Sequence, residues 1–426
     1  MAYEIGILGA GPAGAMAALH LARTGHRCLL LDRATFPRDK ICGDALTGKV
    51  LSELRQLGGP LAGRLAAAAA PAASWGIQFV APNGRAVRVP FKPGFDPATQ
   101  PPDGYVLPRR AFDNLLVEEV RRQPLIELRE NHDVARTARG GLGWQLFDKQ
   151  DNLLAECRLL LVANGAQSGF VRQVAGQVLA PAHHSAGLRA YYRGVQGLDA
   201  DHFVELHFLP ELLPGYLWVF PLADGQANVG LGMLSQDVQR GKVNLRERFD
   251  QVLATHPALA PRFAQAERLG PVRGWGLPLG SRRQPASGAG YLLLGDAASL
   301  VDPFTGEGIS NAMLSGRYAA DWVSRALAAN DSSAAFLAGY DAALYRRLGQ
   351  ELRLSAMLQQ LARWPLVFSF IANRAVANPT LAETLSAMFL DVDLRARLRQ
   401  PGFYLQLLFG GRRGLGRQKP AAPDGA

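Results

Sequence analysis

The stretch that most constrains the fold of this chain is GAGPAG, residues 9–14. An apolar run precedes it, a helix-forming run follows it, and a second apolar run ends at Asp32. In a strand–turn–helix–strand unit of this kind, the first glycine allows the tight turn and the second lets the backbone approach a pyrophosphate. The third lets the helix pack closely on the strand, and the acidic residue can bind ribose hydroxyls. The sequence therefore predicts a dinucleotide-binding unit at the N-terminus.

A second glycine-containing stretch lies near the other end, GYLLLGDAASLVDPFTGEGISNAM at residues 290–313. It has the pattern of a buried strand, a loop and the start of a helix. Asp296 follows the predicted strand, where a carboxylate can bind the ribityl or ribose hydroxyls of a flavin. The helix is predicted to begin near Gly308, and its amides and dipole can stabilise the negative charge of a reduced flavin ring. These features favour a flavin dinucleotide.

The composition is that of a globular protein, with 426 residues, 48% hydrophobic and 19% charged. No apolar run approaches the roughly 18 residues that a membrane-spanning helix needs. Strand-like sequence begins at residue 3, so we expect no signal peptide. The three cysteines show no metal-ligand spacing, which suits a reducing compartment and no structural metal. We therefore expect a cytoplasmic protein.

The net charge of +10 raises the question of an anionic partner. The arginines are mostly scattered and no recognition module is evident, so we expect no nucleic-acid partner. One cluster differs: FYLQLLFGGRRGLGRQK, residues 403–419, joins apolar residues to a basic tail. This combination suits peripheral attachment to an anionic membrane at its inner face. A docked final helix with a frayed tail is the alternative, and the pattern does not separate the two.

The stretch PGYLWVFP, residues 214–221, places Tyr216, Trp218 and Phe220 at alternate positions. In a β-strand this spacing puts all three rings on one face. The rings can be ordinary sheet core, or they can form the wall of a site for a large apolar substrate. Periodicity alone does not distinguish these interpretations.

Three local patterns occur together in this chain. The first is PRDKICGD at residues 37–44, just after the second predicted strand. The second is YLWVFP at 216–221, followed after eight residues by GLG at 230–232. The third is GDAASLVDPFTGEGI at 295–309. Over roughly residues 3–325 the chain resembles the geranylgeranyl reductase family, in which these are the cysteine motif, the substrate-cavity signature and part of the FAD site.

Other pieces are similar to the wider group that also contains aromatic hydroxylases and flavin-dependent halogenases. LPRRAFDNLL, residues 107–116, resembles the RxxFDxxL element of that group, which implies that Arg109 lies near the cofactor. Where these flavoproteins usually carry Asp-Gly, this chain has Asn164-Gly165, which argues against handling NADPH as the hydroxylases do. Halogenases carry two tryptophans in a motif ending in Ile-Pro, whereas YLWVFP in this chain has one tryptophan and ends in Phe-Pro. Hydroxylases lack the Cys42 pattern. Both differences favour the reductase family over these two groups.

The resemblance implies an α/β fold: a Rossmann-like FAD-binding domain with an inserted antiparallel β-sheet substrate domain and a helical C-terminal extension. The expected divisions are 1–50, 105–180 and 270–325 for the FAD-binding domain, 51–104 and 181–269 for the substrate-binding domain, and 326–426 for the C-terminal helical region with its basic tail. In this last region Leu344, Leu348 and Leu352 recur every four residues, which predicts a packing stripe on a helix.

The same motifs imply the site residues, and no metal ligand is among them. The expected cofactor-binding residues are Gly9, Gly11, Ala13, Gly14, Asp32, Arg33, Lys40, Cys42, Gly43, Arg109, Gly295, Asp296, Pro303, Gly306, Gly308 and Ile309. The expected substrate-binding residues are Tyr216, Trp218, Phe220 and Pro221, and the expected catalytic residues are Cys42, Tyr216 and Trp218.

The family implies a reaction in which isolated double bonds of an isoprenoid chain are saturated by hydride transfer from N5 of reduced FAD. The substrate would be a prenyl diphosphate, a prenylated lipid, a quinone tail or a chlorophyll-type side chain. Aromatic faces would stabilise the positive charge that develops on the tertiary carbon by roughly 0.5–2 kcal/mol each. Cys42 would donate the proton, because a thiol is mostly protonated at neutral pH. Its alternative role is that of a small buried hydrophobe.

Other functions stay open at this point. A monooxygenase or halogenase acting on an aromatic substrate would use reduced FAD with oxygen. A lycopene-cyclase-like isomerase would consume no net hydride, and a non-catalytic membrane-associated flavoprotein would only bind FAD and lipid. No second complete nucleotide fingerprint is present, so the electron donor is expected to be NADPH without a dedicated domain, or a ferredoxin-like protein.

Overall fold

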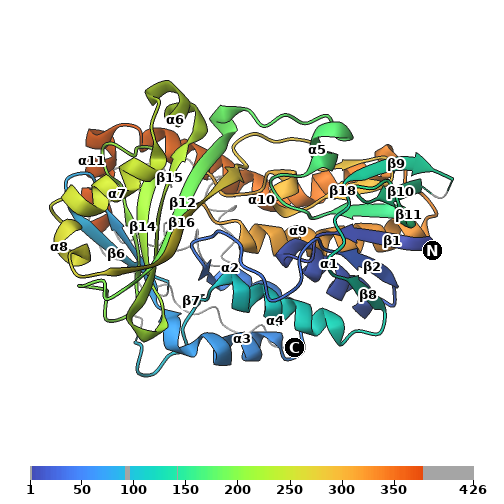
Figure 1. Ribbon diagram of the computed structural model, residues 1–426, viewed down its shortest axis with the longest axis horizontal. Helices are drawn as coiled ribbons and strands as arrows, with labels where there is room; N and C mark the ends of the chain where they lie inside the picture. Colours follow the sequence, from blue (N-terminus) through green and yellow to red (C-terminus); the bar gives the residue numbers. More distant parts are fainter. Residues whose placement is uncertain (1, 92–95, 142, 378–426) are drawn as a thin grey trace, which may run out of the picture.

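The computed structural model describes residues 2–91, 96–141 and 143–377 (Figure 1). Two sheets lie side by side along the long axis of the molecule. The first sheet and its helices occupy the end that carries the N-terminus, and the second sheet occupies the other end. The chain crosses between the two several times, so each half is assembled from separated segments.

The first sheet has the spatial order β17-β18-β11-β1-β2-β8, and β10 and β9 extend it from β11. Strands β18, β11, β1, β2 and β8 run parallel, as in a Rossmann-like fold. The strand bounds are β1 (Ala2–Leu8), β2 (Cys28–Leu31), β8 (Ile126–Arg129), β9 (Arg136–Gly140), β10 (Gly143–Phe147), β11 (Leu153–Val162), β17 (Ser287–Gly288) and β18 (Tyr291–Leu293).

Helices pack on this sheet, and their buried apolar side chains form a hydrophobic core together with those of the strands. Their bounds are α1 (Pro12–Arg23), α2 (Gly48–Leu57), α3 (Leu61–Ala69), α4 (Arg109–Arg121), α5 (Gly169–Gln173), α9 (Ile309–Ala328) and α10 (Ala334–Leu361). Helices α1 and α9 approach closely because α9 carries Gly316, where a Cβ would lie 2.3 Å from the Ala13 carbonyl oxygen. The predicted stripe on α10 is confirmed, since Leu344, Leu348 and Leu352 are all buried in this core.

The second sheet has the spatial order β16-β12-β15-β14-β13-β5-β6. Its strand bounds are β5 (Gly76–Val80), β6 (Ala86–Pro90), β12 (His184–Arg193), β13 (Val204–His207), β14 (Tyr216–Pro221), β15 (Gln226–Leu234) and β16 (Glu267–Pro278). One pair departs from the expected antiparallel pattern: β13 and β5 run parallel. They can do so because the chain between them is long and passes through the first sheet, where it forms β8, β9, β10 and β11.

Several segments cross the expected divisions. Helices α2 and α3 join the core of the first sheet, whereas β5 and β6, from the same stretch 51–104, belong to the second sheet. Strand β16 runs through the expected boundary between residues 269 and 270 and pairs with β12. Local sequence could not show this, because the membership of a segment depends on the surface against which it packs.

Smaller elements complete the described chain. They are the strands of a small sheet, β3 (Ala45–Leu46), β4 (Ala73–Ser74) and β7 (Gly104–Val106); the helices α6 (Ser235–Gly241), α7 (Leu245–Thr255), α8 (Ala260–Phe263) and α11 (Pro365–Ala377); and the short 3-10 turns η1 (Ala70–Ala72), η2 (Pro181–His183), η3 (Ala223–Gly225) and η4 (Gly295–Ala298). In the described part of the chain, no helix has the length and apolar character needed to cross a bilayer. The basic cluster at 403–419 lies outside the described residues.

Candidate active site

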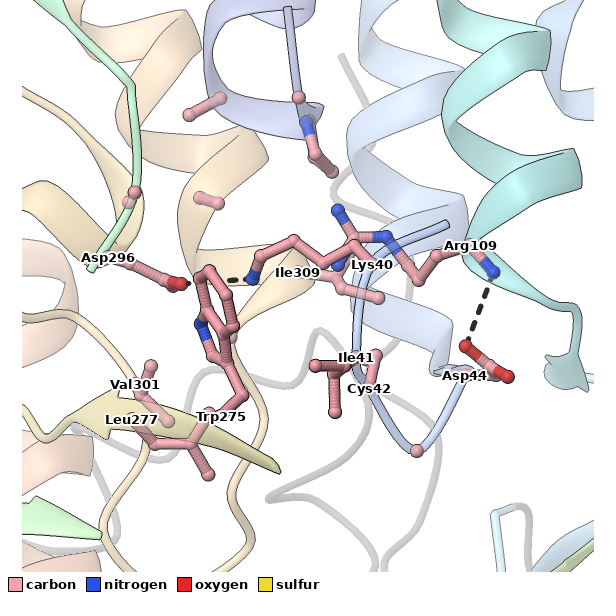
Figure 2. Close-up of a pocket in the computed structure, with 18 of the residues that line it drawn as sticks. Lys40, Ile41, Cys42, Asp44, Arg109, Trp275, Leu277, Asp296, Val301 and Ile309 are labelled. Carbon is pink, nitrogen blue, oxygen red and sulfur yellow. Dashed lines mark hydrogen bonds and ion pairs between the residues drawn. The ribbon is translucent and has the colours of Figure 1, made fainter. Parts of the chain in front are cut away.

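A cavity of about 570 Å³ is lined by residues of both sheets (Figure 2). Its lining comprises the glycine-containing turns after β1 and β18, the loop that follows β2, and apolar side chains of the second sheet. The predicted residues that line it are Gly9, Gly11, Ala13, Asp32, Arg33, Lys40, Cys42, Gly43, Arg109, Tyr216, Trp218, Phe220, Gly295, Asp296, Gly306, Gly308 and Ile309.

Three predicted residues do not line the cavity. Gly14 is buried beneath the first turn, Pro221 ends β14, and the Pro303 carbonyl accepts a hydrogen bond from Gln359 Nε2 of α10 at 2.6 Å. They are close to the site in sequence, but their contacts are with the surrounding fold. Motif membership alone could not separate them from the residues that face the cavity.

The turn between β1 and α1 brings polar backbone to the cavity. Gly9 has a φ of +95°, and a Cβ on Gly14 would lie only 1.8 Å from the Gly9 carbonyl oxygen. The Asp32 carboxylate accepts hydrogen bonds from the N–H groups of Ala10, at 2.7 Å, and Ala34, at 2.8 Å. Helix α1 begins without a side-chain cap, so its first amides can bind a pyrophosphate. This cradle fits the dinucleotide that the fingerprint predicts.

A second helix N-terminus faces the same cavity. Helix α9 begins at Ile309, directly after Gly308, without a side-chain cap. Beside it, Lys40 Nζ lies 3.3 Å from Asp296 Oδ2 and 5.2 Å from the centre of the Trp275 ring. Figure 2 shows Lys40 reaching across the cavity toward Asp296. The uncapped amides and the nearby acid fit the ring and ribityl parts of a flavin.

The aromatic residues of β14 lie on the cavity side of the second sheet. The ring centres of Tyr216 and Trp218 are 6.4 Å apart, and those of Trp218 and Phe220 are 6.3 Å apart. Leu217 and Val219 point to the opposite face and are fully buried there. The three rings belong to a packed cluster and also line the cavity, so the two interpretations of this stretch are compatible.

The loop after β2 brings Cys42 to these rings. A Cβ on Gly43 would lie 2.9 Å from the Phe220 ring, so only a glycine lets the loop approach this closely. The Cys42 carbonyl accepts a hydrogen bond of 2.8 Å from Asn228 Nδ2, on the strand next to β14. The cysteine motif and the aromatic motif, far apart in sequence, thus meet in one place.

Arg109 lines the same cavity and is almost fully buried. Its Nε and Nη2 donate to the Asp113 carboxylate at 2.6 and 2.8 Å, and Arg38 Nη1 donates to the same carboxylate at 2.6 Å. Burial alone would lower the pKa of Arg109, but Asp113 and the nearby Cys42 side chain raise that pKa above its ordinary value. Arg109 is therefore a permanent cation beside Cys42.

The site also contains residues that the sequence motifs did not single out. The Asp44 carboxylate is completely buried and contacts Tyr191 and Asn228. Glu307 accepts a hydrogen bond from Thr47 Oγ1 at 2.5 Å, and burial raises its pKa. Asp44 ends the stretch PRDKICGD, and Glu307 stands between two predicted glycines inside GDAASLVDPFTGEGI, so their place within a motif was the available signal. Nothing in the sequence pairs Tyr191 or Asn228 with the Cys42 loop.

Comparisons with known proteins agree with this architecture. A family model described as an FAD binding domain matches residues 2–342, well over half of the chain. Digeranylgeranylglycerophospholipid reductase 2 of Methanopyrus kandleri is 29% identical over 90% of this chain and 91% of its own length. The corresponding reductase of Methanoculleus marisnigri is 30% identical over 80% and 81%. Menaquinone reductase of Mycobacterium tuberculosis is 31% identical over 75% and 76%.

Solved structures share the fold. A geranylgeranyl bacteriochlorophyll reductase-like protein of Thermoplasma acidophilum superposes with a TM-score of 0.71 at 22% identity, covering 91% of this chain and 99% of that one. The flavin-dependent brominase Bmp2 gives 0.74 at 20% identity, covering 91% and 93%. FAD is the cofactor for which the site is built, and the chain belongs to the geranylgeranyl reductase family of FAD-dependent oxidoreductases.

Proposed function

We propose that this protein saturates isolated double bonds in an isoprenoid chain of the geranylgeranyl type. The observation that carries the proposal is the meeting of Cys42 and the aromatic side chains of β14 in the cavity that also contains the FAD cradle. The names of the relatives support a prenylated substrate, since they act on digeranylgeranylglycerophospholipids or menaquinone. The two chemically distinct candidates are thus a prenylated lipid and a prenylated quinone.

The chain's own residues would bind and polarise the alkene. An isoprenoid chain gains roughly 0.8 kcal/mol for each buried CH₂, which suits a cavity lined by apolar side chains of the second sheet. Reduced FAD, when bound, supplies the hydride. The faces of Tyr216 and Trp218 would stabilise positive charge on the tertiary carbon of the alkene.

Cys42 would supply the proton. Its S–H bond breaks as a C–H bond forms at the alkene carbon that does not receive the hydride, and the thiolate then recovers a proton from water. Arg109, buried beside Cys42, would be the cation that faces the thiolate in the interval. The products are one saturated bond and oxidised flavin for each double bond reduced.

The test uses the FAD-loaded protein, reduced with dithionite under anaerobic conditions. Geranylgeranyl diphosphate, a digeranylgeranyl lipid and menaquinol, whose ring is already reduced and cannot accept the hydride, are added separately, and the flavin absorbance and product mass are followed. We expect reoxidation with a mass gain of one H₂ per double bond, and no reoxidation with the fully saturated chain. Reoxidation only after oxygen is admitted, with modification of an aromatic substrate, would instead support the monooxygenase or halogenase alternative.

The physiological donor is proposed to be NADPH or a ferredoxin-like protein. Each is offered to the oxidised protein in place of dithionite, and the faster reduction of the flavin identifies the donor. This step is separate from the reaction with the alkene, so its outcome does not affect the test above.

We also propose that the protein works at a membrane surface, where prenylated lipids reside. Apolar side chains are exposed near the C-terminal end of the described chain: Trp364 at 66%, Leu366 at 86% and Phe370 at 52%. Trp364 immediately precedes α11, which carries the other two and lies against β6 of the second sheet. Such residues can enter the headgroup region of a bilayer, and the net charge of +10 favours anionic lipids.

A further inference from the structure

Asp44 is a buried acid that the proposed reaction does not use. Its side chain is completely buried, and its backbone has a φ of +68°. Oδ2 accepts hydrogen bonds from Tyr191 Oη at 2.6 Å and Asn228 Nδ2 at 2.8 Å, and Oδ1 accepts one from the Arg109 N–H at 3.2 Å. These donors come from β12, β15 and the start of α4 and compensate for the lost water. Asp44 is thus fixed from three elements at once.

Asn228 connects Asp44 to both halves of the site. Its Nδ2 donates to the Cys42 carbonyl and to Asp44, each at 2.8 Å, and its Oδ1 accepts from Trp218 Nε1 at 2.9 Å. A reversed amide would place its oxygen against a carboxylate and a carbonyl, and its NH₂ against the indole N–H. The contacts therefore determine the orientation of the amide.

We propose that Asp44 and Asn228 are positioning residues that hold the Cys42 loop and the Trp218 ring in one fixed arrangement at the cavity. The alkene would then meet its proton donor and its aromatic support in a set geometry. The role in turnover rests on the proposed function, whereas the positioning itself does not. The packing of Gly43 against Phe220 is a second contact between the same two parts and agrees with this role.

A polar link suits this role better than apolar packing. Leucines in place of Asp44 and Asn228 would fill a similar volume without burying a charge. They would not hydrogen-bond the Trp218 ring or the Cys42 carbonyl, so neither group would be held in one position. A fully satisfied hydrogen-bond network specifies one arrangement. The Arg189 guanidinium lies 4.2 Å from the Tyr191 ring and pairs with Asp39 at 2.9 Å, so the tyrosine that donates to Asp44 is itself fixed.

The first test measures the position of the Cys42 loop without turnover. Cys42 is partly exposed, whereas Cys28 and Cys157 are buried, and burial raises the pKa of each of these two thiols to about 12. Iodoacetamide should therefore modify Cys42 selectively in the FAD-loaded protein, as measured by peptide mass spectrometry. In Asn228→Ala we expect the rate at Cys42 to change about tenfold, the scale of a lost hydrogen bond to a charged group.

Two further variants keep the test informative if Asn228→Ala does not fold. Asp44→Asn tolerates the left-handed backbone, removes the charge and replaces one acceptor oxygen with an NH₂ donor. Tyr191→Phe removes one donor, and Tyr192→Phe is its matched control, because Tyr192 lies on the opposite face of β12 in a different cluster. We expect Tyr191→Phe and Asp44→Asn to alter the Cys42 rate and Tyr192→Phe to leave it unchanged. Rates within twofold of wild type in all three network variants would overturn the proposal.

The second test uses single-turnover reoxidation of reduced flavin by the prenyl substrate. We expect Asn228→Ala to slow it at least about tenfold while the FAD dissociation constant changes less than about threefold. Equal losses of rate and FAD binding would mean a general structural role and would contradict positioning. If the wild type reacts with no prenyl substrate but the variants still alter Cys42 alkylation, the proposed function fails and the positioning of Cys42 stands.

Discussion

The Trp218 ring lies across the backbone of Gly230, its partner in the antiparallel pair of β14 and β15. A Cβ on Gly230 would come within 2.2 Å of both the Trp218 ring and the Leu188 carbonyl oxygen. The first glycine of the GLG stretch is thus explained by the tryptophan that it accommodates.

Gly230→Ala should therefore displace the Trp218 ring and destabilise the protein by roughly 1–3 kcal/mol, the usual result of overpacking. Reoxidation by a prenyl substrate should slow, while FAD binding is retained. Gly232→Ala is the matched control, because the nearest atom to a Cβ there is 4.0 Å away. Equal effects of the two alanines on turnover and on chemical denaturation would contradict this explanation of the motif.

Replacing Cys42 with serine tests the proton donor. Serine keeps the size of the side chain but is a far weaker acid than a thiol, so we expect reoxidation by the prenyl substrate to slow by about 10²-fold or more. FAD binding should be unchanged. Cys28→Ala removes a thiol buried in β2 and serves as the control. Unchanged turnover in Cys42→Ser would rule out the thiol as the acid.

Two of the three glycines of the GAGPAG stretch, Gly14 and Gly11, should fail in different ways when replaced by alanine. Gly14→Ala places a Cβ 1.8 Å from the Gly9 oxygen, so it should lower the thermal stability of the apoprotein. Gly11→Ala meets nothing closer than 3.6 Å, so the apoprotein should keep its stability. Its methyl group would occupy the approach of the pyrophosphate, and we expect FAD affinity to fall at least about tenfold. Thermal melts and FAD fluorescence titrations separate the two; a normal FAD affinity in Gly11→Ala would contradict the assigned cradle.

Stability should depend on pH through Asp44. Burial raises the pKa of Asp44 from 3.8 to about 6, although the hydrogen bond from Tyr191 opposes the rise. Between these values the folded protein binds more protons than the unfolded chain, so the contribution of Asp44 to the free energy of unfolding falls as pH rises. Asp44→Asn lacks this titration. Its stability relative to wild type should therefore increase by on the order of 3 kcal/mol between about pH 4 and pH 7.

Urea unfolding of both proteins over this pH range measures the difference. The lost hydrogen-bond acceptor of Asp44→Asn contributes a constant offset, whereas the ionisation contributes the slope. A difference that does not vary with pH would mean that Asp44 has an ordinary pKa in the folded protein.

Membrane binding should depend on the exposed apolar residues at α11. The double variant Trp364→Ala, Leu366→Glu removes two large exposed side chains, each worth roughly 1.5–3 kcal/mol when buried. We expect its partitioning onto phosphatidylglycerol vesicles to fall at least about tenfold in cosedimentation, with FAD content unchanged. Vesicles of neutral lipid report the contribution of charge. If the double variant binds the vesicles as strongly as the wild type does, α11 is not part of the membrane contact.

The sequence by itself determined the elements whose signals are local. The glycine spacing at residues 9–14 predicted a strand, a turn and a helix, and the helix after Gly308 begins where expected. Leucines spaced by four predicted the buried stripe on α10. Each of these signals follows from backbone conformation or from the periodicity of one element, so a single stretch of chain contains it.

Only the tertiary structure decided which segments belong to each sheet and which distant residues meet between the two sheets. It assigned α2 and α3 to the first core, carried β16 across the expected boundary, and placed β5 parallel to β13. It also joined Asp44 to Asn228, residues 184 positions apart. Such pairings depend on which surfaces meet when the chain crosses between the sheets. Since no local periodicity encodes that meeting, the arrangement of Cys42 and Trp218 around one buried amide could be found only in the folded molecule.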